Sequence, residues 1–413
     1  MKGKIIKISN LHFGRLSRRA FAAVLTLLTL PLQVIAFILM RSLRPFVLVR
    51  VGWINTPRIG HMMANMDMGL LALSLENHSG RELIFWVPQQ EFVCNRFLLK
   101  MIKREVNYLP RWSWLIVNRL NNSIAGGKVH DIELGSDRDN KSQTDNYPAQ
   151  FKFTEKEILL GQKCLSLYGL PKGAPFVCLN VRDSSYLSAE YPTNDWSYHN
   201  HRDSLIGTYL RAAEELTKRG YFVFRMGAVT REKLVTDNPM IFDYSNNGMR
   251  TEFMDIYLGA NCEFAISTSS GWDCVPYFFR RPLLFVNAIG MDLPCSKKTI
   301  YLMKSRISVI THKKLTLRES FEKKVGFVDH DKDLESAGVK LIDNTSEQIL
   351  NATIEMAERC QGIWLDTPGS DGLQKQFWAT YNDCLTIEER SHFGEFRARY
   401  VTSELVADPD WFK

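Results

Sequence analysis

Short apolar runs and amphipathic stretches alternate along the first third of the chain. The apolar runs are rich in β-branched residues, as in buried strands, and the stretches between them repeat with a helical period. The predicted strands are 46–51, 82–87 and 128–134, and the predicted helices are 62–77, 90–104 and 112–121. This alternation is typical of a parallel sheet covered by helices.

A second series of the same kind begins near residue 154. Thr154 with Glu157, and Thr345 with Gln348, have the spacing of capping boxes and mark two helix starts. The predicted helices are 154–168, 201–219, 252–260, 271–279, 345–360 and 372–384, and the predicted strands are 176–181, 221–225, 240–244, 263–267 and 283–286. The fold class is therefore α/β.

A polar stretch, 135–147, separates the two series and is interpreted as an inter-domain linker or a long surface loop. Two α/β units joined in this way predict two Rossmann-like domains with a cleft between them. The predicted parts are a basic and apolar segment 1–44, an N-terminal domain 45–150, a C-terminal domain 151–385, and a tail 386–413 that packs back on the N-terminal domain.

The first fifty residues differ from the rest. They contain nine basic residues and no acidic one, and residues 20–40 are uncharged. As a helix, those 21 residues would be about 31 Å long, enough to cross a hydrocarbon core. Basic residues flank both ends, which favours the cytoplasmic side for both, and Pro31 should break or kink the helix. A re-entrant hairpin, an interfacial helix, a single span and a buried core helix all remain open, with monotopic attachment favoured.

Charge and cysteine content narrow the function classes. The net charge is +7, yet residues 51–413 hold 43 basic and 45 acidic residues. A neutral body with a basic arm favours an anionic membrane surface over nucleic acid. The eight cysteines form no C-x-x-C pair, so buried free thiols in a reducing compartment are expected. We therefore expect a monotopic or peripheral protein on the cytoplasmic face of the inner membrane.

In open α/β sheets, ligands bind at the carboxyl ends of strands, so the strand-end loops carry the candidate chemistry. Arg182 and Asp183 follow one predicted strand, and Arg225 and Gly227 follow the next. An arginine fork there could hold a phosphate, or could simply brace its loop. The run between a third strand and its helix offers hydroxyls and amides to an anion: Ser267, Thr268, Ser269, Ser270 and Gly271.

Two further loops complete the predicted site. Arg58, Gly60 and His61 lie in the first loop of the N-terminal domain, where His61 could act as a general base. His199, His201 and Arg202 lie where a long loop meets the start of the helix predicted at 201–219, and they are expected to contact the acceptor or to cap that helix. No metal site is expected: Asp137 and Asp139 resemble an Asp-x-Asp motif but lie in the polar linker.

The segments 177–183, 220–227 and 265–271, with the histidine loop, resemble bacterial glycosyltransferases found with surface-polysaccharide genes. More distantly, Arg182 and the Ser/Thr run are similar to the diphosphate-binding motifs of fucosyltransferases, although Asn180 stands where their motif has His. The Ser-Thr-Ser-Ser-Gly run is also similar to that of heptosyltransferases. These resemblances imply a GT-B fold, no cofactor and no obligatory metal.

The sequence therefore predicts a glycosyltransferase that moves a sugar from a nucleotide sugar to a cell-surface glycan or lipid-linked acceptor. Arg182, Asp183 and His61 are the catalytic candidates. Two alternatives remain: a nucleotide-sugar epimerase of GT-B-like fold, and a non-catalytic polysaccharide assembly protein. The epimerase would need no membrane segment, and the assembly protein would need no phosphate-binding loops.

Overall fold

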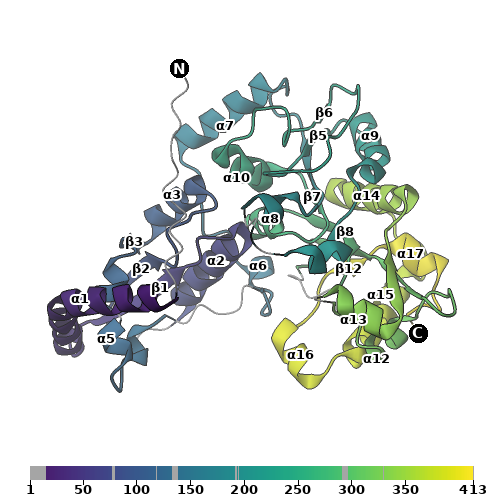
Figure 1. Ribbon diagram of the computed structural model, residues 1–413. Coiled ribbons are helices and arrows are strands. Elements are labelled where there is room, and N and C mark those ends of the chain that lie inside the picture. Colours follow the sequence, from purple (N-terminus) through teal and green to yellow (C-terminus); the bar gives the residue numbers. More distant parts are fainter. Residues whose placement is uncertain are drawn as a thin grey trace. The chain divides into compact units, whose positions relative to one another are not determined.

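The computed structural model describes residues 15–76, 80–117, 119–132, 138–190, 193, 195–290, 296–328 and 330–412. Over these residues the chain is a mixed α/β protein with two parallel sheets, as the alternating pattern predicts (Figure 1). Its contacts define two compact units. Unit 1 comprises Met1–Asn55, Leu75–Phe92 and Glu105–Leu134, and unit 2 comprises Thr56–Ser74, Val93–Arg104 and Gly135–Lys413. The predicted domains are contiguous along the chain, whereas these units interleave.

Unit 1 contains a three-stranded parallel sheet. β1 (Leu48–Ile54) pairs with β2 (Glu82–Pro88) along its whole length, and β3 (Asn107–Tyr108) pairs with the other side of β2. Its helices are α1 (Arg15–Leu43), α4 (Ser113–Val117) and α5 (Arg119–Asn122), with a 3₁₀ turn η1 (Lys128–His130). The strand predicted at 128–134 is wrong over its described part, where η1 forms and Asp131 alone bridges to Val51.

α1 is an unbroken helix that continues through Pro31, which corrects the expected break. One face of it packs on α4, α5 and β1, where Gln33 and Met40 are 2% and 5% exposed. Arg41 fixes its end by donating to the Asn121 side chain at 3.2 Å and to a neighbouring carbonyl at 3.1 Å. α1 is therefore an integral part of unit 1.

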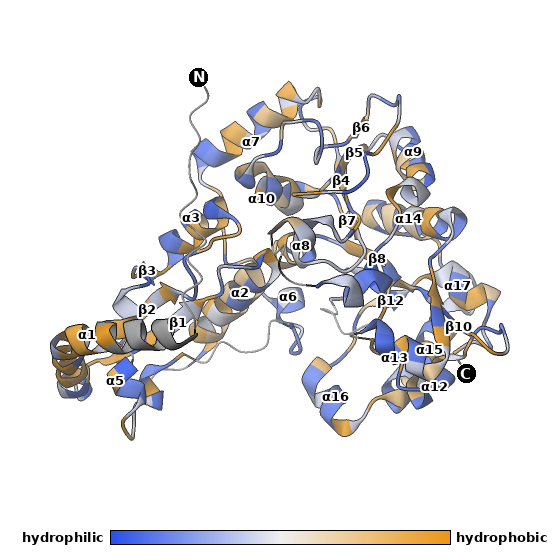
Figure 2. Ribbon diagram, viewed as in Figure 1, coloured by the Kyte–Doolittle hydropathy of each residue, from blue (hydrophilic) through white to orange (hydrophobic). Residues whose placement is uncertain are grey.

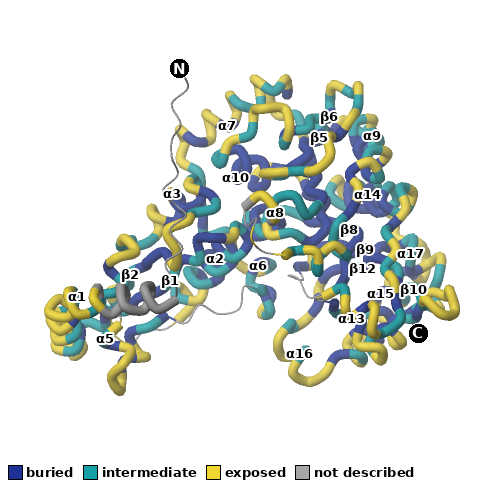
Figure 3. Tube along the Cα trace, viewed as in Figure 1, coloured by how far each residue is buried: buried dark blue, intermediate teal, exposed yellow. Residues whose placement is uncertain are grey.

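The other face of α1 is apolar and exposed, as the orange colour in Figure 2 and the yellow in Figure 3 show. The stretch Thr26–Leu43 is long and apolar enough to cross a membrane, and only 11% of it is buried. Its exposed apolar residues, with one just before it, are Val24, Leu27, Leu28, Leu30, Leu32, Val34, Ile35, Ile38, Leu39 and Leu43. The interpretation as a buried core helix is therefore wrong.

Unit 2 contains a seven-stranded sheet in the order β12-β9-β8-β7-β4-β5-β6, in which every pair is parallel. The strands are β4 (Phe176–Asn180), β5 (Phe222–Arg225), β6 (Ile241–Phe242), β7 (Ala265–Ser267), β8 (Leu283–Ala288), β9 (Thr299–Met303) and β12 (Arg399–Tyr400). The four central strands β4, β7, β8 and β9 are buried throughout, as expected of a sheet covered on both faces. β10 (Ser305–Ser308) and β11 (Val339–Ile342) form a separate antiparallel pair.

Helices surround this sheet, and α9 packs on α14 over a shared apolar core. The α-helices are α2 (Ile59–Leu75), α3 (Arg96–Glu105), α6 (Gln143–Asn146), α7 (Glu155–Leu167), α8 (Ser185–Glu190), α9 (Leu210–Lys218), α10 (Glu252–Asn261), α11 (Cys274–Phe278), α12 (Leu317–Glu322), α13 (Asp331–Ala337), α14 (Ser346–Gln361), α15 (Ser370–Cys384), α16 (Ile387–Phe393) and α17 (Thr402–Ala407). The 3₁₀ turns are η2 (Ser197–Arg202), η3 (Ile206–Tyr209) and η4 (Gly271–Asp273). The helix predicted to start at residue 201 starts instead at Leu210, after η2 and η3.

α2 and α3 belong to unit 2 because polar contacts hold them there. Asp67, fully buried on α2, pairs with Arg280 at 3.0 Å. On α3, Arg104 pairs at 2.7 Å with Glu157, the acid of the capping box that opens α7. Asn95, just before α3, donates to the Glu252 carbonyl at 2.9 Å. Both predicted capping boxes, at Thr154 and at Thr345, are present.

The polar stretch 135–147 is anchored in unit 2 over its described residues. Asp139 is buried and accepts hydrogen bonds from the Gln143 amide at 2.6 Å, the Thr144 amide at 2.9 Å and the Tyr277 hydroxyl at 3.2 Å. Asp145 accepts from the Ser296 hydroxyl at 2.6 Å. Residues 138–147 are therefore held to unit 2 by side-chain hydrogen bonds.

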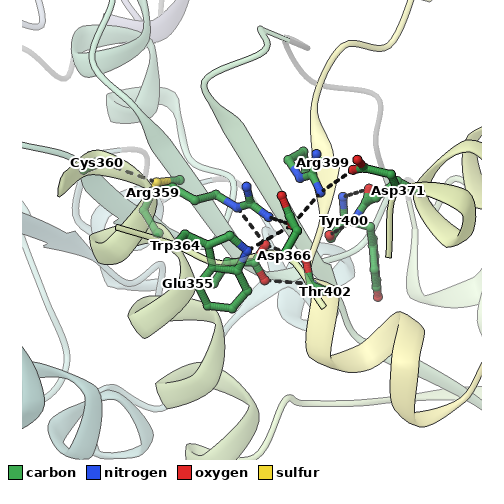
Figure 4. Close-up of polar contacts among 11 residues, drawn as sticks. Glu355, Arg359, Cys360, Trp364, Asp366, Asp371, Arg399, Tyr400 and Thr402 are labelled. Carbon is green, nitrogen blue, oxygen red and sulfur yellow. Dashed lines mark hydrogen bonds and ion pairs between the residues drawn. The ribbon is translucent and has the colours of Figure 1, made fainter. Parts of the chain in front are cut away.

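The C-terminal tail is part of unit 2. β12 pairs with β9, and the residues around it are held by polar contacts with α14 and α15 (Figure 4). Glu355, fully buried on α14, accepts from the amide and hydroxyl of Thr402, both at 2.7 Å. Asp366 accepts from Arg359 at 2.7 Å and Arg399 at 3.1 Å.

Candidate functional site

The loops after β4 and β7 emerge side by side, because these strands are neighbours and Asn180 pairs with Ser267. The Asn180 amide nitrogen donates to the Ser270 hydroxyl at 2.6 Å. The Arg182 backbone amide donates to the Thr268 hydroxyl at 2.8 Å. The structure thus joins two of the loops that the sequence selects, the Arg182 loop and the run Ser267–Gly271, hereafter the Ser-Thr loop.

Asp273 holds the Ser-Thr loop in place through hydrogen bonds, and the sequence analysis did not select it. It is buried and accepts from the Ser267 hydroxyl, from the Ser270 amide at 2.5 Å and from Asn180 at 3.2 Å. Burial raises the pKa of this carboxyl to about 6. The sequence signal was available, because Ser270 and Asp273 have capping-box spacing and form one.

Among the hydroxyls of the Ser-Thr loop, that of Ser269 makes no hydrogen bond. Three hydroxyls, those of Ser267, Thr268 and Ser270, are used inside the site by the contacts above. Ser269 has a φ of 64°, is 8% exposed, and its buried Oγ has no hydrogen-bond partner. Among the described residues, the amides of Ser269 and of the exposed Gly271 donate no backbone–backbone hydrogen bond. A buried hydroxyl left open in this way suits a ligand with acceptor atoms.

Two arginines adjoin these open groups. Arg182, with 11% of its side chain exposed, pairs with Asp203 at 2.5 Å and donates to the His199 carbonyl at 3.1 Å. Arg202 donates to the Ser269 carbonyl at 3.0 Å, so it lies at the Ser-Thr loop. Burial, and then the positive charge of Arg202, lower the pKa of the Arg182 guanidinium. An anion between the two cations would relieve that repulsion.

The start of α2 lies against the same loop. A Cβ on Gly60 would be 2.9 Å from the Gly271 carbonyl oxygen, so only glycine permits this approach. This contact brings the start of α2 against the Ser-Thr loop, with Arg58, which is exposed, and His61, which is half-buried, flanking Gly60 in the sequence. The positive end of a 17-residue helix adds to the attraction for an anion.

Arg225 and Gly227 do not join this group. The Arg225 side chain is 1% exposed, pairs with Asp243 at 3.1 Å and donates to the Thr230 hydroxyl at 3.0 Å. Gly227 has a φ of 144°, and a Cβ there would lie 2.5 Å from Thr230. Both residues are engaged in bracing the loop after β5, beside a cavity of about 130 Å³ that Arg225 lines.

The remaining predicted site residues are Asp183, in the loop after β4, and His199 and His201, in η2. Asp183 accepts from the amides of Ser185 at 2.9 Å and Arg231 at 2.8 Å, so its carboxylate fixes backbone. His199 and His201 lie in η2, and burial followed by the charges of Arg202 and Arg182 lowers the pKa of His199 to about 4. His199 is therefore neutral at pH 7.

The described residues contain no group of three or more His, Cys, Asp or Glu side chains that could hold a metal ion. Asp139 is engaged in the hydrogen bonds given above, and Asp137 lies outside the described residues. Seven of the eight cysteines are described, and all seven are free thiols.

The raised pKa of Asp273 predicts a measurable pH dependence of stability. Between the ordinary carboxyl value of 3.8 and about 6, the folded state holds a proton that the unfolded state has released. This group therefore adds stability as the pH falls through 6, up to about 3 kcal/mol. We expect the free energy of unfolding of wild type, relative to Asp273→Asn, to increase by that order from pH 7 to pH 4. A constant difference in urea titrations would contradict the assignment.

No family model and no curated protein matches the chain. Among solved structures it is similar to the E. coli ADP-heptose LPS heptosyltransferase II, at 14% identity and a TM-score of 0.39, over 76% of this chain and 100% of that one. It is also similar to a family 9 glycosyltransferase from Veillonella parvula, at 10% identity and a TM-score of 0.42, over 75% of this chain and 97% of that one. The structure of the E. coli heptosyltransferase WaaC with ADP-2-deoxy-2-fluoro heptose is similar at 14% identity and a TM-score of 0.32, over 62% of this chain and 93% of that one. Two of these three structures are heptosyltransferases.

Proposed function

We propose that this protein is a glycosyltransferase that uses a nucleotide sugar, holds its diphosphate without a metal ion, and acts on a glycan or lipid-linked acceptor. The observation that carries the proposal is the grouping of Arg182 and Arg202 at the Ser-Thr loop, beside the open Ser269 hydroxyl. Two cations beside an unpaired buried hydroxyl match a diphosphate better than an uncharged ligand.

The chemistry follows from this grouping. Breaking the bond between the sugar and the diphosphate leaves negative charge on the departing phosphate oxygens. Fixed donors aimed at that charge lower the barrier without a metal ion. Arg182, Arg202 and the loop amides are the donors that we assign to it. A GT-B arrangement, with the acceptor bound by the N-terminal domain and the donor by the C-terminal one, remains part of the proposal.

Membrane attachment through α1 is the second part of the proposal. Unit 1 holds 13 of the 52 basic and 6 of the 45 acidic residues, so its net charge of +7 is that of the whole chain. An exposed apolar helix on a positively charged unit suits an anionic membrane surface. This supports monotopic or peripheral attachment at the cytoplasmic face, where acceptors of surface-polysaccharide synthesis would be met.

A mass-spectrometric screen of the full-length protein with nucleotide sugars and lipid-linked acceptors tests the reaction. We expect one donor to lose its sugar to an acceptor and to raise the melting temperature. At 100 times its dissociation constant, a ligand adds about 2.7 kcal/mol. A donor that is only epimerised would establish the epimerase alternative. No shift with any nucleotide sugar would contradict the proposed site and favour a non-catalytic assembly protein.

Metal independence gives a further prediction. We expect full activity in excess EDTA, because arginines and amides replace the metal charge. Asp139→Ala should lower the free energy of unfolding by about 2–4 kcal/mol, since it leaves buried donors unpaired, while the folded fraction keeps its turnover. The exposed Asp237→Ala is the matched control. Activity lost in EDTA and restored by Mn²⁺ would establish a metal-assisted enzyme instead.

A further inference from the structure

A histidine–aspartate pair lies next to the proposed diphosphate site. The Nδ1 atom of His201, in η2, contacts the carboxylate of Asp331, the first residue of α13. The His201 backbone amide reaches the same carboxylate at 3.3 Å. The His201 side chain is 4% exposed, and its second ring nitrogen, Nε2, is buried without a hydrogen-bond partner. Such an unpaired nitrogen is costly unless a ligand uses it.

Both residues line a hollow of about 410 Å³, large enough for a sugar-sized group. Lys304 fixes the backbone of this region, because its ammonium donates to the carbonyls of His201 and Asp203, each at 2.9 Å. Lys304 also pairs with Asp343 at 2.8 Å, which neutralises its charge. The hollow therefore has a rigid wall in which the His201–Asp331 pair is set.

The pair is directly connected to the anion-binding arginines. Arg202 is the next residue after His201, and Arg182 pairs with Asp203 and with the His199 carbonyl. A group bound in the hollow would thus lie beside whatever the two arginines hold. A carboxylate on Nδ1 fixes the imidazole tautomer whose Nε2 lone pair can accept a proton, and stabilises the imidazolium formed.

We propose that His201, positioned by Asp331, is the general base that activates the acceptor. The inference rests on the proposed transfer reaction and names the residue that performs one step of it. Nε2 takes the proton of the acceptor hydroxyl as its oxygen bonds to the anomeric carbon of the donor. The bond from that carbon to the diphosphate oxygen breaks, and its electron pair leaves with the nucleoside diphosphate. Arg182 and Arg202 stabilise the negative charge of this leaving group. His201 thereby replaces His61, which the sequence selects for this role.

The test uses the full-length protein and a nucleotide sugar that binds it, with release of nucleoside diphosphate as the readout and water as the surrogate acceptor. We expect His201→Gln to lower kcat by about 10²–10⁴-fold with KM and the Kd of the nucleoside diphosphate changed less than about threefold. Asp331→Asn keeps a hydrogen-bonding side chain and should lower kcat with the same unchanged Kd. The control is His392→Gln, an exposed histidine on α16, away from η2 and α13.

A pH profile separates a base from a structural residue. Wild-type kcat should fall on the acid side of its pH profile, and His201→Gln should lose that limb. The charged neighbours are Asp331 and Glu335 from α13, Arg202 from η2, and Lys304, Lys340 and Asp343 from the segments around β10 and β11. A His201→Gln enzyme with kcat within threefold, or with the acid limb retained, would overturn the inference. If no nucleotide sugar binds wild type, the proposed function fails and the inference with it.

Discussion

Replacing Arg182 by Ala should weaken nucleoside diphosphate binding by about 10- to 150-fold, the equivalent of a charged hydrogen bond of about 1.5–3 kcal/mol. The double variant Arg182→Ala with Arg202→Ala should lose more affinity than either single variant, because in a single variant the remaining arginine still attracts the phosphate. Titration calorimetry with the nucleoside diphosphate measures both. The ion pair with Asp203 also predicts some loss of stability, since that carboxylate, with a quarter of its side chain exposed, would lose its partner.

Two further variants separate binding from folding. Arg182→Lys keeps the charge but loses the planar fork, so it should retain stability and bind the diphosphate more weakly than wild type. Arg231→Ala, exposed at the neighbouring loop, should leave affinity unchanged. If folded Arg182→Ala binds as tightly as wild type, Arg182 only braces its loop.

Placing arginines on the outer face of α1 should abolish vesicle binding. Leu28 and Ile35 are 73% and 54% exposed. Each apolar side chain moved from water into lipid contributes about 1.5–3 kcal/mol, so Leu28→Arg with Ile35→Arg should lower vesicle affinity by at least about 100-fold. The measurement is flotation of the full-length protein with vesicles containing anionic lipid. Leu365→Arg, at an 87% exposed position of unit 2, is the matched control.

The burial pattern of α1 favours a helix lying in the membrane surface over a span. Gln33 and Met40 are covered by unit 1, so the helix from Gln33 onward cannot be surrounded by lipid. The uncharged residues before it, 20–32, would extend only about 20 Å of the roughly 30 Å required. A tag placed before Met1 should therefore stay accessible to protease added outside the vesicles. A protected tag would establish a span, and a variant that still floats would exclude this face as the contact.

Local patterns predicted much of the fold and part of the site. The alternating runs predicted the class of sheet, and a threonine followed three residues later by Glu or Gln predicted the starts of α7 and α14. The Arg182 and Ser-Thr loops could be expected to meet, because both follow buried parallel strands. What sequence reasoning missed depends on packing between distant segments. Asp331 lies 130 residues from His201, and no local pattern relates them. Arg225 lies at a strand end, where a ligand-binding arginine is expected, but its side chain pairs with Asp243. That ion pair could not be read from the local sequence.

The position of β12 has a consequence for solubility. β9 would be the edge of the seven-stranded sheet without it, and all five residues of β9, Thr299–Met303, are buried and mostly apolar. An exposed apolar edge strand is a template for pairing with other chains. β12 covers this edge with only two residues, and the contacts of Figure 4 keep it in place. Because β12 follows β9 along the chain, synthesis leaves β9 as an aggregation-prone edge until Arg399 and Tyr400 have emerged.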